Sequence, residues 1–330
     1  MKSVLTAPKT TLNEVNAVIA ATRAENLWLA NFTSSNTKAT YRRAVADFLL
    51  DMGINSPEAL YSVGQAHVVA WRDHLKSKGL SNAAICNRLS ALSSLFGFLT
   101  DKQLCGFNPV SGVRRPNRGV SGIGSGKTPA LTRRQVRLLL DAPLTHQGVR
   151  KVSRLQQLRD RAILHVFFWT GGRCSEPAKL KVNDFRVDRG YWVLEFTIKG
   201  EATNVVALAE FDAQEAECVQ AVLDYLEASG HKYDKDAPLF MAVKAGKNSG
   251  EAMCRNSFYR LFKKYVALAG LPDTISPHSA RATFITQAYE AGMLGEDIQR
   301  TVGHRSIMTT EGYNQSAKKL RKSASLGVRY

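Results

Sequence analysis

Acidic residues and long apolar runs are scarce in this sequence. Its 28 Asp and Glu stand against 45 Lys and Arg, so the 330-residue chain carries a formal net charge of +17. Such an excess repels itself in a compact fold, and the expected partner is a polyanion. No apolar run approaches the roughly 20 residues that cross a bilayer, and the N-terminus MKSVLTAPKTTLNEV lacks a signal peptide's apolar core. We therefore expect a cytoplasmic protein without a membrane partner.

Cysteine is also scarce, and it is scattered. An odd number of cysteines without a C-x-x-C pair fits neither a disulfide framework nor a zinc site. The five are Cys86, Cys105, Cys174, Cys218 and Cys254. We therefore expect neither a disulfide-stabilised fold nor a structural zinc ion.

The remaining composition is that of a folded protein, with 44% hydrophobic and 22% charged residues. At about 150 residues per domain, the length suggests two domains. The positive surplus is spread along the chain, which favours nucleic acid as the polyanion. An anionic membrane surface is the weaker alternative, because no basic helix with a strong apolar face stands out.

The first part of the chain is predicted to be helical. After a loose extension over 1–20, apolar residues at three- and four-residue spacing predict a four-helix domain over 21–110, with Thr37 and Ser81 as N-caps. Residues 111–130 are rich in Pro, Gly, Ser and Arg and contain no acid, so we expect a flexible basic linker with affinity for DNA phosphates. Its cations are Arg114, Arg115, Arg118 and Lys127.

The second part, 131–330, is predicted to be mainly α with one small sheet. A strongly apolar helix over 158–169 stops at Gly171-Gly172, and two β-rich runs at 191–198 and 205–208 predict a hairpin that turns at Lys199-Gly200. Further helices are expected after Thr132 and over about 213–228, 255–269, 277–291 and 295–302.

Polar residues that could take part in catalysis or phosphate binding recur in this second part. Ser276 and Pro277 suit the start of a helix, which would place His278 and Arg281 on one face, within reach of a single anion. A solvated helix face is the alternative. Arg173 and Glu176 follow a glycine doublet. The Arg173 guanidinium could bind phosphate while Glu176 holds it in position. An ordinary ion pair between the two side chains is the alternative.

Two more pieces complete the pattern. Gly303-His304 is followed nine residues after the histidine by Tyr313 in a polar setting, TTEGYNQS, without an apolar periodicity; a surface tyrosine is the alternative. Lys199 at the hairpin turn would ordinarily be a solvated lysine. In this order, the residues resemble the tyrosine recombinases, or phage integrase family, over nearly the whole chain. The matching stretches are TGGRCSE, the turn lysine, His-x-x-Arg, Gly-His and the tyrosine, with NTKATYRRAVADFLLDMG and LSNAAICNRLSALSSLFGFL in the first part.

The resemblance implies a fold, a site and a reaction. The fold is an N-terminal core-binding, SAM-like domain followed by an α/β catalytic domain. The reaction is cleavage and religation of DNA through a covalent 3'-phosphotyrosine, with no metal, no ATP and no other cofactor. The implied catalytic residues are Arg173, Lys199, His278, Arg281, His304 and the nucleophile Tyr313, with Glu176 orienting Arg173 or His278.

Three positions depart from the family's usual pattern. Gly172 replaces a larger apolar residue, Pro177 follows the acid, and Ala280 stands within His-x-x-Arg. They put the local helix geometry in doubt more than the chemistry, Pro177 above all, because beyond a helix's first turn proline removes a hydrogen bond.

The resemblance also implies partners. They are double-stranded DNA with a specific site and a homotetramer that acts through a Holliday junction, with room for accessory DNA-bending proteins. Integration or excision of a mobile element is the expected role, and dimer resolution is the alternative. A non-cleaving DNA-binding regulator on the same scaffold and a type IB topoisomerase are the competing classes. The tail after residue 315 is expected either to pack on a neighbouring protomer or to form a frayed basic end.

Overall fold

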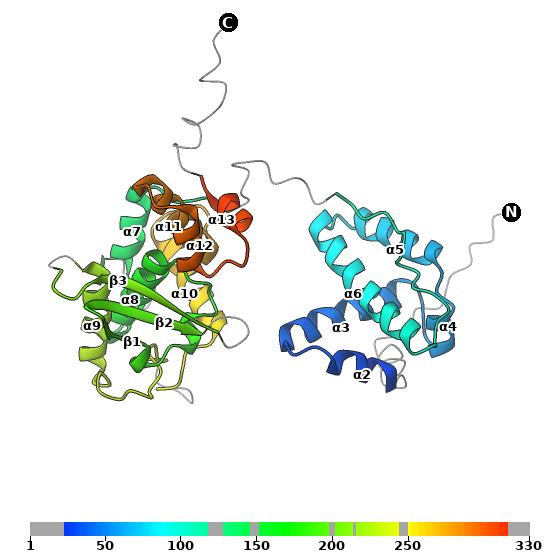
Figure 1. The fold of residues 1–330 in the computed structure, drawn as a ribbon, viewed down its shortest axis with the longest axis horizontal. Helices are drawn as coiled ribbons and strands as arrows, with labels where there is room; N and C mark the ends of the chain where they lie inside the picture. The colour runs from blue at the N-terminus through cyan, green and yellow to red at the C-terminus, as the bar shows by residue number, and fades with distance from the viewer. Residues whose placement is uncertain are drawn as a thin grey trace, which may run out of the picture. The chain divides into compact units, whose positions relative to one another are not determined.

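The structure of the protein is a computed structural model, which describes residues 23–117, 128–145, 152–197, 202–213, 216–243 and 250–315. The chain divides into two compact units, Met1–Val120 and Ser121–Tyr330, and each is described by itself (Figure 1). Several predictions fall outside the described residues. They concern the extension over 1–20, Arg118, Lys127, Lys199 and the tail after residue 315.

The first unit is helical throughout its described part. It contains α2 (Arg23–Ala30), α3 (Ser35–Asp51), α4 (Pro57–Tyr61), α5 (Gln65–Ser77) and α6 (Asn82–Asp101). The four predicted helices are present, and α4 is an additional short helix that begins with a proline after the N-cap Ser56. Ser81 caps α6 as predicted, but the cap of α3 is Ser34, whose Oγ accepts the Thr37 N–H.

Aromatic and aliphatic side chains from all five helices form the core of this unit. Trp28 and Trp71 are almost fully buried, and their indole N–H groups donate to Ser94 Oγ and Asp51 Oδ2, so neither buried donor is left unpaired. Helix α6 is long and apolar enough to cross a membrane by length and composition alone. It lies in this core, where Ile85, Leu89, Leu92 and Phe96 are at most 1% exposed.

The start of the basic stretch differs from the predicted linker. Residues 114–117 are hydrogen-bonded to the first unit, because Arg72 donates to the Arg114 carbonyl and Asn82 donates to the Asn117 carbonyl. The Arg115 guanidinium donates to Ser90 Oγ. Arg114 and Arg115 nevertheless remain exposed. These contacts hold the two arginines on the surface of the first unit.

The second unit combines helices with a three-stranded antiparallel sheet in the order β1-β2-β3. The predicted hairpin is β2 (Tyr191–Thr197) and β3 (Thr203–Glu210), and the sequence missed β1 (Phe185–Asp188). Two 3-10 turns, η1 (Pro177–Lys179) and η2 (Val182–Asp184), precede the sheet. The α-helices are α7 (Arg133–Thr145), α8 (Arg154–Thr170), α9 (Glu217–Ser229), α10 (Arg255–Leu268), α11 (Pro277–Ala291), α12 (Gly295–Val302) and α13 (Ile307–Tyr313).

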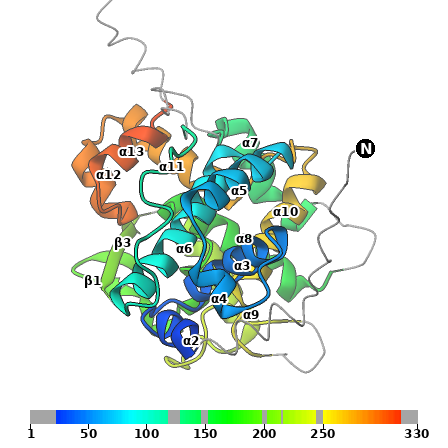
Figure 2. The same cartoon turned by 90° about the vertical axis from the view of Figure 1, so that its right-hand side faces the viewer.

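Helix α8 is the centre of this unit. It contacts α7, α9, α10, α11 and β3, and most of its residues from Gln157 onward are buried. The Phe167 ring meets the rings of Phe258 and Phe262 edge to face, which joins α8 to α10. At one end of the unit α11, α12 and α13 lie together, as two perpendicular views show (Figures 1 and 2). Segments far apart in the chain meet near the end of α8, where Arg173 donates a hydrogen bond to the Gly303 carbonyl, 130 residues later.

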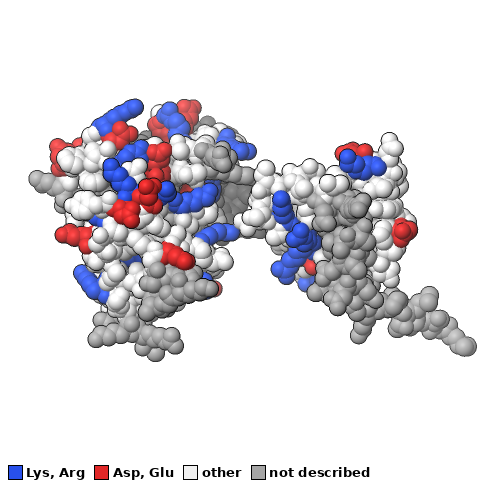
Figure 3. Space-filling view, turned by 90° about the horizontal axis from the view of Figure 1, so that it is seen from below, with Lys and Arg blue, Asp and Glu red and all other residues white. Residues whose placement is uncertain are grey.

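Charge is distributed differently on the two units. On the face shown in Figure 3, acidic and basic side chains are intermixed over the second unit, whereas basic side chains predominate on the first. The ion pairs Arg137–Glu217 and Arg186–Glu195 illustrate the mixing on the second unit. The basic surplus of the chain, +17 in all, is therefore not concentrated in one patch on the face of the second unit that Figure 3 shows.

Candidate active site

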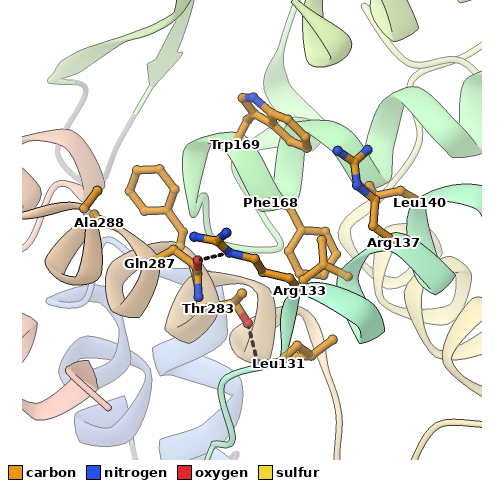
Figure 4. A pocket seen from close by; sticks show the side chains of 12 residues that line it. Leu131, Arg133, Arg137, Leu140, Phe168, Trp169, Thr283, Gln287 and Ala288 are labelled. Atoms are coloured by element: carbon orange, nitrogen blue, oxygen red, sulfur yellow. Dashed lines mark hydrogen bonds between the residues drawn. The ribbon is translucent and has the colours of Figure 1, made fainter. Parts of the chain in front are cut away.

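A large cavity of the second unit is apolar and lies between α7, α8 and α11 (Figure 4). Its volume is about 550 Å³, and Phe168, Trp169 and Leu131 contribute to its walls. Arg133 crosses it and donates to Gln287 Oε1 (Figure 4). Among the described residues, none of those predicted to be catalytic lines this cavity. The polar residues gather elsewhere, where the loop after α8 meets α11 and the segment between α12 and α13.

Arg173 is held by Glu176 at two points. One carboxylate oxygen of Glu176 accepts the Arg173 backbone N–H at 2.6 Å, and the other accepts Nη1 of the guanidinium at 2.8 Å. Nη2 of Arg173 donates to the Gly303 carbonyl at 3.3 Å. The Glu176 side chain is 10% exposed and that of Arg173 39%. A largely buried carboxylate thus holds an accessible guanidinium at two points.

Glycine and proline at this loop explain its geometry. Gly171 ends α8 with φ +59°, and a Cβ there would lie 2.8 Å from the Phe284 ring. A Cβ on Gly172 would lie 3.3 Å from Glu176 Oε2, tighter than most such contacts, so the small residue lets the carboxylate approach. Pro177 begins the turn η1, where its missing N–H costs no hydrogen bond. The doubt over Pro177 is therefore removed.

Arg281 is the most deeply buried charge in the cluster. It is 1% exposed and lies on the first turns of α11, whose N-cap is Ser276 as predicted. Its Nη1 donates to the Gly171 carbonyl at 2.7 Å, Nη2 to the Val302 carbonyl at 2.6 Å, and Nε to His304 Nε2 at 3.2 Å. Burial and the nearby Arg173 lower the pKa of Arg281 to about 10, so it stays charged at neutral pH. The two arginines thus donate to the consecutive carbonyls of residues 302 and 303.

His304 lies between Arg281 and α13. Its Nδ1 is 2.9 Å from Thr310 Oγ1, and its ring is stacked on Tyr313 at 5.6 Å between centroids and 15° between planes. Burial, then Arg281 and Arg173, lower the pKa of His304 to about 4, so the ring is neutral at pH 7. Both ring nitrogens are engaged within the protein.

Tyr313 ends α13, a helix that the sequence did not predict. Its ring packs against the small cluster of Ile285, Ile298 and Val302, and its carbonyl accepts from Thr286 Oγ1 at 3.2 Å. Tyr313 is half-buried. The stack on His304 and this packing exclude the alternative that Tyr313 is an unpacked surface tyrosine.

His278 is exposed at the start of α11, three residues before Arg281. Its pKa is lowered by partial burial and by the positive charges of Arg281, Arg173 and Arg255. The expectation that His278 and Arg281 share one face is only half met, because Arg281 points into the protein and His278 to its surface. At neutral pH the histidine is an accessible base beside three guanidinium groups.

Two further expectations concern ligands, namely a metal ion and DNA. Within the described ranges, no three side chains of His, Cys, Asp or Glu form a group arranged to hold a metal ion. Arg114 and Arg115, the expected DNA contacts that the structure describes, are exposed on the first unit.

Comparison with protein families accounts for this arrangement. The model of the phage integrase family matches residues 129–319, and that of the phage integrase N-terminal SAM-like domain matches residues 24–103. This chain belongs to the phage integrase family. Its enzyme class is therefore that of the tyrosine recombinases, which cleave and rejoin DNA. The predicted fold, a SAM-like domain plus a catalytic domain with a small sheet, is confirmed.

Relatives in sequence extend over most of the chain. The tyrosine recombinase XerD of Pseudomonas putida is 27% identical over 301 residues, which cover 88% of this chain and 90% of the relative. XerC of Roseiflexus castenholzii is 26% identical over 280 residues, which cover 85% and 83%.

Solved structures share the fold at lower identity. XerH recombinase bound to its difH substrate after cleavage is 19% identical with a TM-score of 0.70, covering 98% of this chain and 91% of that one. A lambda integrase tetramer bound to a Holliday junction is 15% identical with a TM-score of 0.67, covering 93% and 78%.

Sequence reasoning missed the groups that hold the cluster together. Three are backbone carbonyls, of Gly171, Val302 and Gly303, which no side-chain motif reveals. The fourth is Thr310, one helical turn before Tyr313. Its spacing of three residues from the tyrosine was the one available signal, and it is meaningful only once residues 307–313 are known to be helical.

Proposed function

We propose that this protein is a site-specific DNA recombinase in which Tyr313 attacks a phosphodiester and forms a covalent 3'-phosphotyrosine. The observation that carries the proposal is the convergence of Arg173, Arg281 and His304 around residues 302–304, with Tyr313 stacked on the histidine. The covalent link retains the free energy of the broken bond for religation, so no ATP is required.

The two arginines are assigned to the phosphate. A guanidinium has five N–H groups, so Arg281, which uses three on protein acceptors, retains two for phosphate oxygens. Arg173 is the accessible member of the pair, and we expect the phosphate to enter on its side. Both would stabilise the negative charge that grows on the non-bridging oxygens in the transition state. We assign no metal ion to this step.

Proton transfer is assigned to two other residues. The tyrosine phenol has an ordinary pKa of about 10, so attack at neutral pH requires a base, and neutral, exposed His278 suits that role. Lys199, outside the described residues, is proposed to protonate the departing 5' oxygen. Since His304 Nε2 accepts from Arg281, we assign His304 to holding Arg281 and supporting Tyr313.

At the level of assembly, we propose that four copies exchange strands between two duplexes through a Holliday junction in the cytoplasm. The solved relatives include a tetramer bound to such a junction. Integration or excision of a mobile element is the favoured role, and dimer resolution is the alternative. The basic residues Arg114 and Arg115 are proposed to contact DNA phosphates.

A trapping experiment tests the proposal. The target site is first recovered by sequencing DNA crosslinked to the protein in the source cell, and a nicked duplex of that site is then incubated with purified protein. We expect a covalent adduct with wild type and none with Tyr313→Phe, although both bind the duplex. Tyr233→Phe, at an 88% exposed tyrosine, is the matched control and should react normally.

The other classes give different results. Wild type that binds its site but forms no adduct would favour a non-cleaving regulator. An adduct with relaxation of supercoils, but no recombinant product from two marked duplexes, would favour a topoisomerase.

A further inference from the structure

Thr310 is a buried hydroxyl residue next to the proposed nucleophile. It lies on α13 one turn before Tyr313, it is 0% exposed, and its Oγ1 is 2.9 Å from Nδ1 of His304. A buried hydroxyl and a buried ring nitrogen at this distance share a hydrogen bond. The adjacent Thr309 is exposed.

The direction of this hydrogen bond follows from Arg281. A guanidinium has donors and no acceptor, so the Nε–H of Arg281 requires His304 Nε2 to be without a proton. A neutral imidazole without a proton on Nε2 carries it on Nδ1. Nδ1 is then the donor and Oγ1 of Thr310 the acceptor. The low pKa of His304, about 4, agrees with a neutral ring.

The backbone of His304 is fixed as well. Its N–H donates to the Gln299 carbonyl at 3.1 Å, and its carbonyl accepts from Gln299 Nε2 at 3.0 Å. Together with the Tyr313 stack, these bonds set the position and plane of the ring. The location of the ring proton then depends on the partners of the two nitrogens.

We propose that Thr310 is a positioning residue of the cleavage step, whose hydroxyl accepts from the Nδ1–H tautomer of His304 and fixes its ring in place. In that form Nε2 accepts from Arg281, and the ring lies parallel to Tyr313. The inference rests on the proposed function, since it deepens the description of the same site. Its consequence is that the helix of the nucleophile and the buried phosphate-binding arginine are coupled through one imidazole.

The tautomer is measurable without DNA. Full-length protein labelled with 15N in the histidine rings gives distinct nitrogen shifts and proton couplings for the Nδ1–H and Nε2–H forms, and His304→Gln assigns the signal. We expect the Nδ1–H form in wild type at pH 7 and in Thr310→Ser, which keeps a hydroxyl. Thr310→Val keeps the β-branched shape and removes the acceptor, so the Nδ1–H that Arg281 requires loses its hydrogen bond, and its nitrogen and proton shifts should move away from the wild-type values.

Cleavage supplies the second measurement. In single-turnover reactions on the nicked duplex, Thr310→Val should cleave about 10- to 100-fold more slowly, the range for loss of a residue that orients a functional histidine. Its DNA affinity should be unchanged, because the Thr310 side chain is buried and therefore not accessible to a duplex. Thr310→Ser should recover most of the rate. Thr309→Val, the same change at an exposed neighbour, should cleave like wild type.

The outcomes separate cleanly. An Nε2–H tautomer in wild type overturns the inference, as does cleavage by Thr310→Val within twofold of wild type. A Thr310→Ser variant as slow as Thr310→Val also overturns it, because the hydroxyl would then not be the active feature. Wild type that forms no adduct contradicts the proposed function itself, which is a different result from any difference among the Thr310 variants.

Discussion

Replacing Glu176 by glutamine tests how the accessible arginine is held. The variant keeps the shape of the side chain and removes its charge, so an amide NH2 faces Arg173 Nη1 in place of the carboxylate oxygen that accepts at 2.8 Å. A hydrogen bond to a charged group contributes about 1.5–3 kcal/mol. Because the Arg173 side chain is 39% exposed, solvent screening places the loss near the lower end of that range.

A loss of about 1.4 kcal/mol in the transition state corresponds to a rate about 10-fold lower. We therefore expect Glu176→Gln to form the covalent adduct about 10-fold more slowly in single-turnover assays, with DNA binding unchanged. Glu227→Gln, at an exposed acid on α9, is the control. If Glu176→Gln reacted within twofold of wild type, Glu176 would not be what positions Arg173.

Two further predictions concern stability and DNA affinity. Burial, with Arg161 and Arg137, lowers the pKa of His165 to about 3, and neither ring nitrogen has a partner among the described residues. The unfolded chain binds this proton near pH 6.5, so stability should fall below that pH by up to about 1.4 kcal/mol per unit. Urea unfolding from pH 7 to 5 should show a smaller fall for His165→Phe, and an equal fall refutes the assignment. Replacing both Arg114 and Arg115 by alanine should reduce the slope of log affinity against log salt by up to about 2, whereas an unchanged slope excludes them as phosphate contacts.

Sequence patterns predicted the long elements well because those elements bury one face against a core. Helix α6 begins after Ser81 as expected, and α8 ends at the glycine doublet. The short elements were missed for a physical reason. Strand β1 has four residues and α13 has seven, too few for a period to emerge, and packing rather than local preference holds them in place.

The candidate site was predicted in composition but not in geometry. The pairing of Arg173 with Glu176 followed from their spacing. The burial of Arg281 did not, because its partners are carbonyls at residues 171 and 302, brought together by the packing of α8, α11 and α12. The role of His304 as an acceptor likewise depends on an arginine 23 residues away in the sequence.

The central claim is that Tyr313 becomes covalently bonded to DNA, and mass spectrometry of the trapped adduct tests it most directly. Trypsin should release the peptide 306–318, SIMTTEGYNQSAK, in which Tyr313 is the one tyrosine. After nuclease digestion, the account predicts that this peptide carries the remaining nucleotide on Tyr313. A nucleotide on any other residue, or an adduct that persists in Tyr313→Phe, would contradict it.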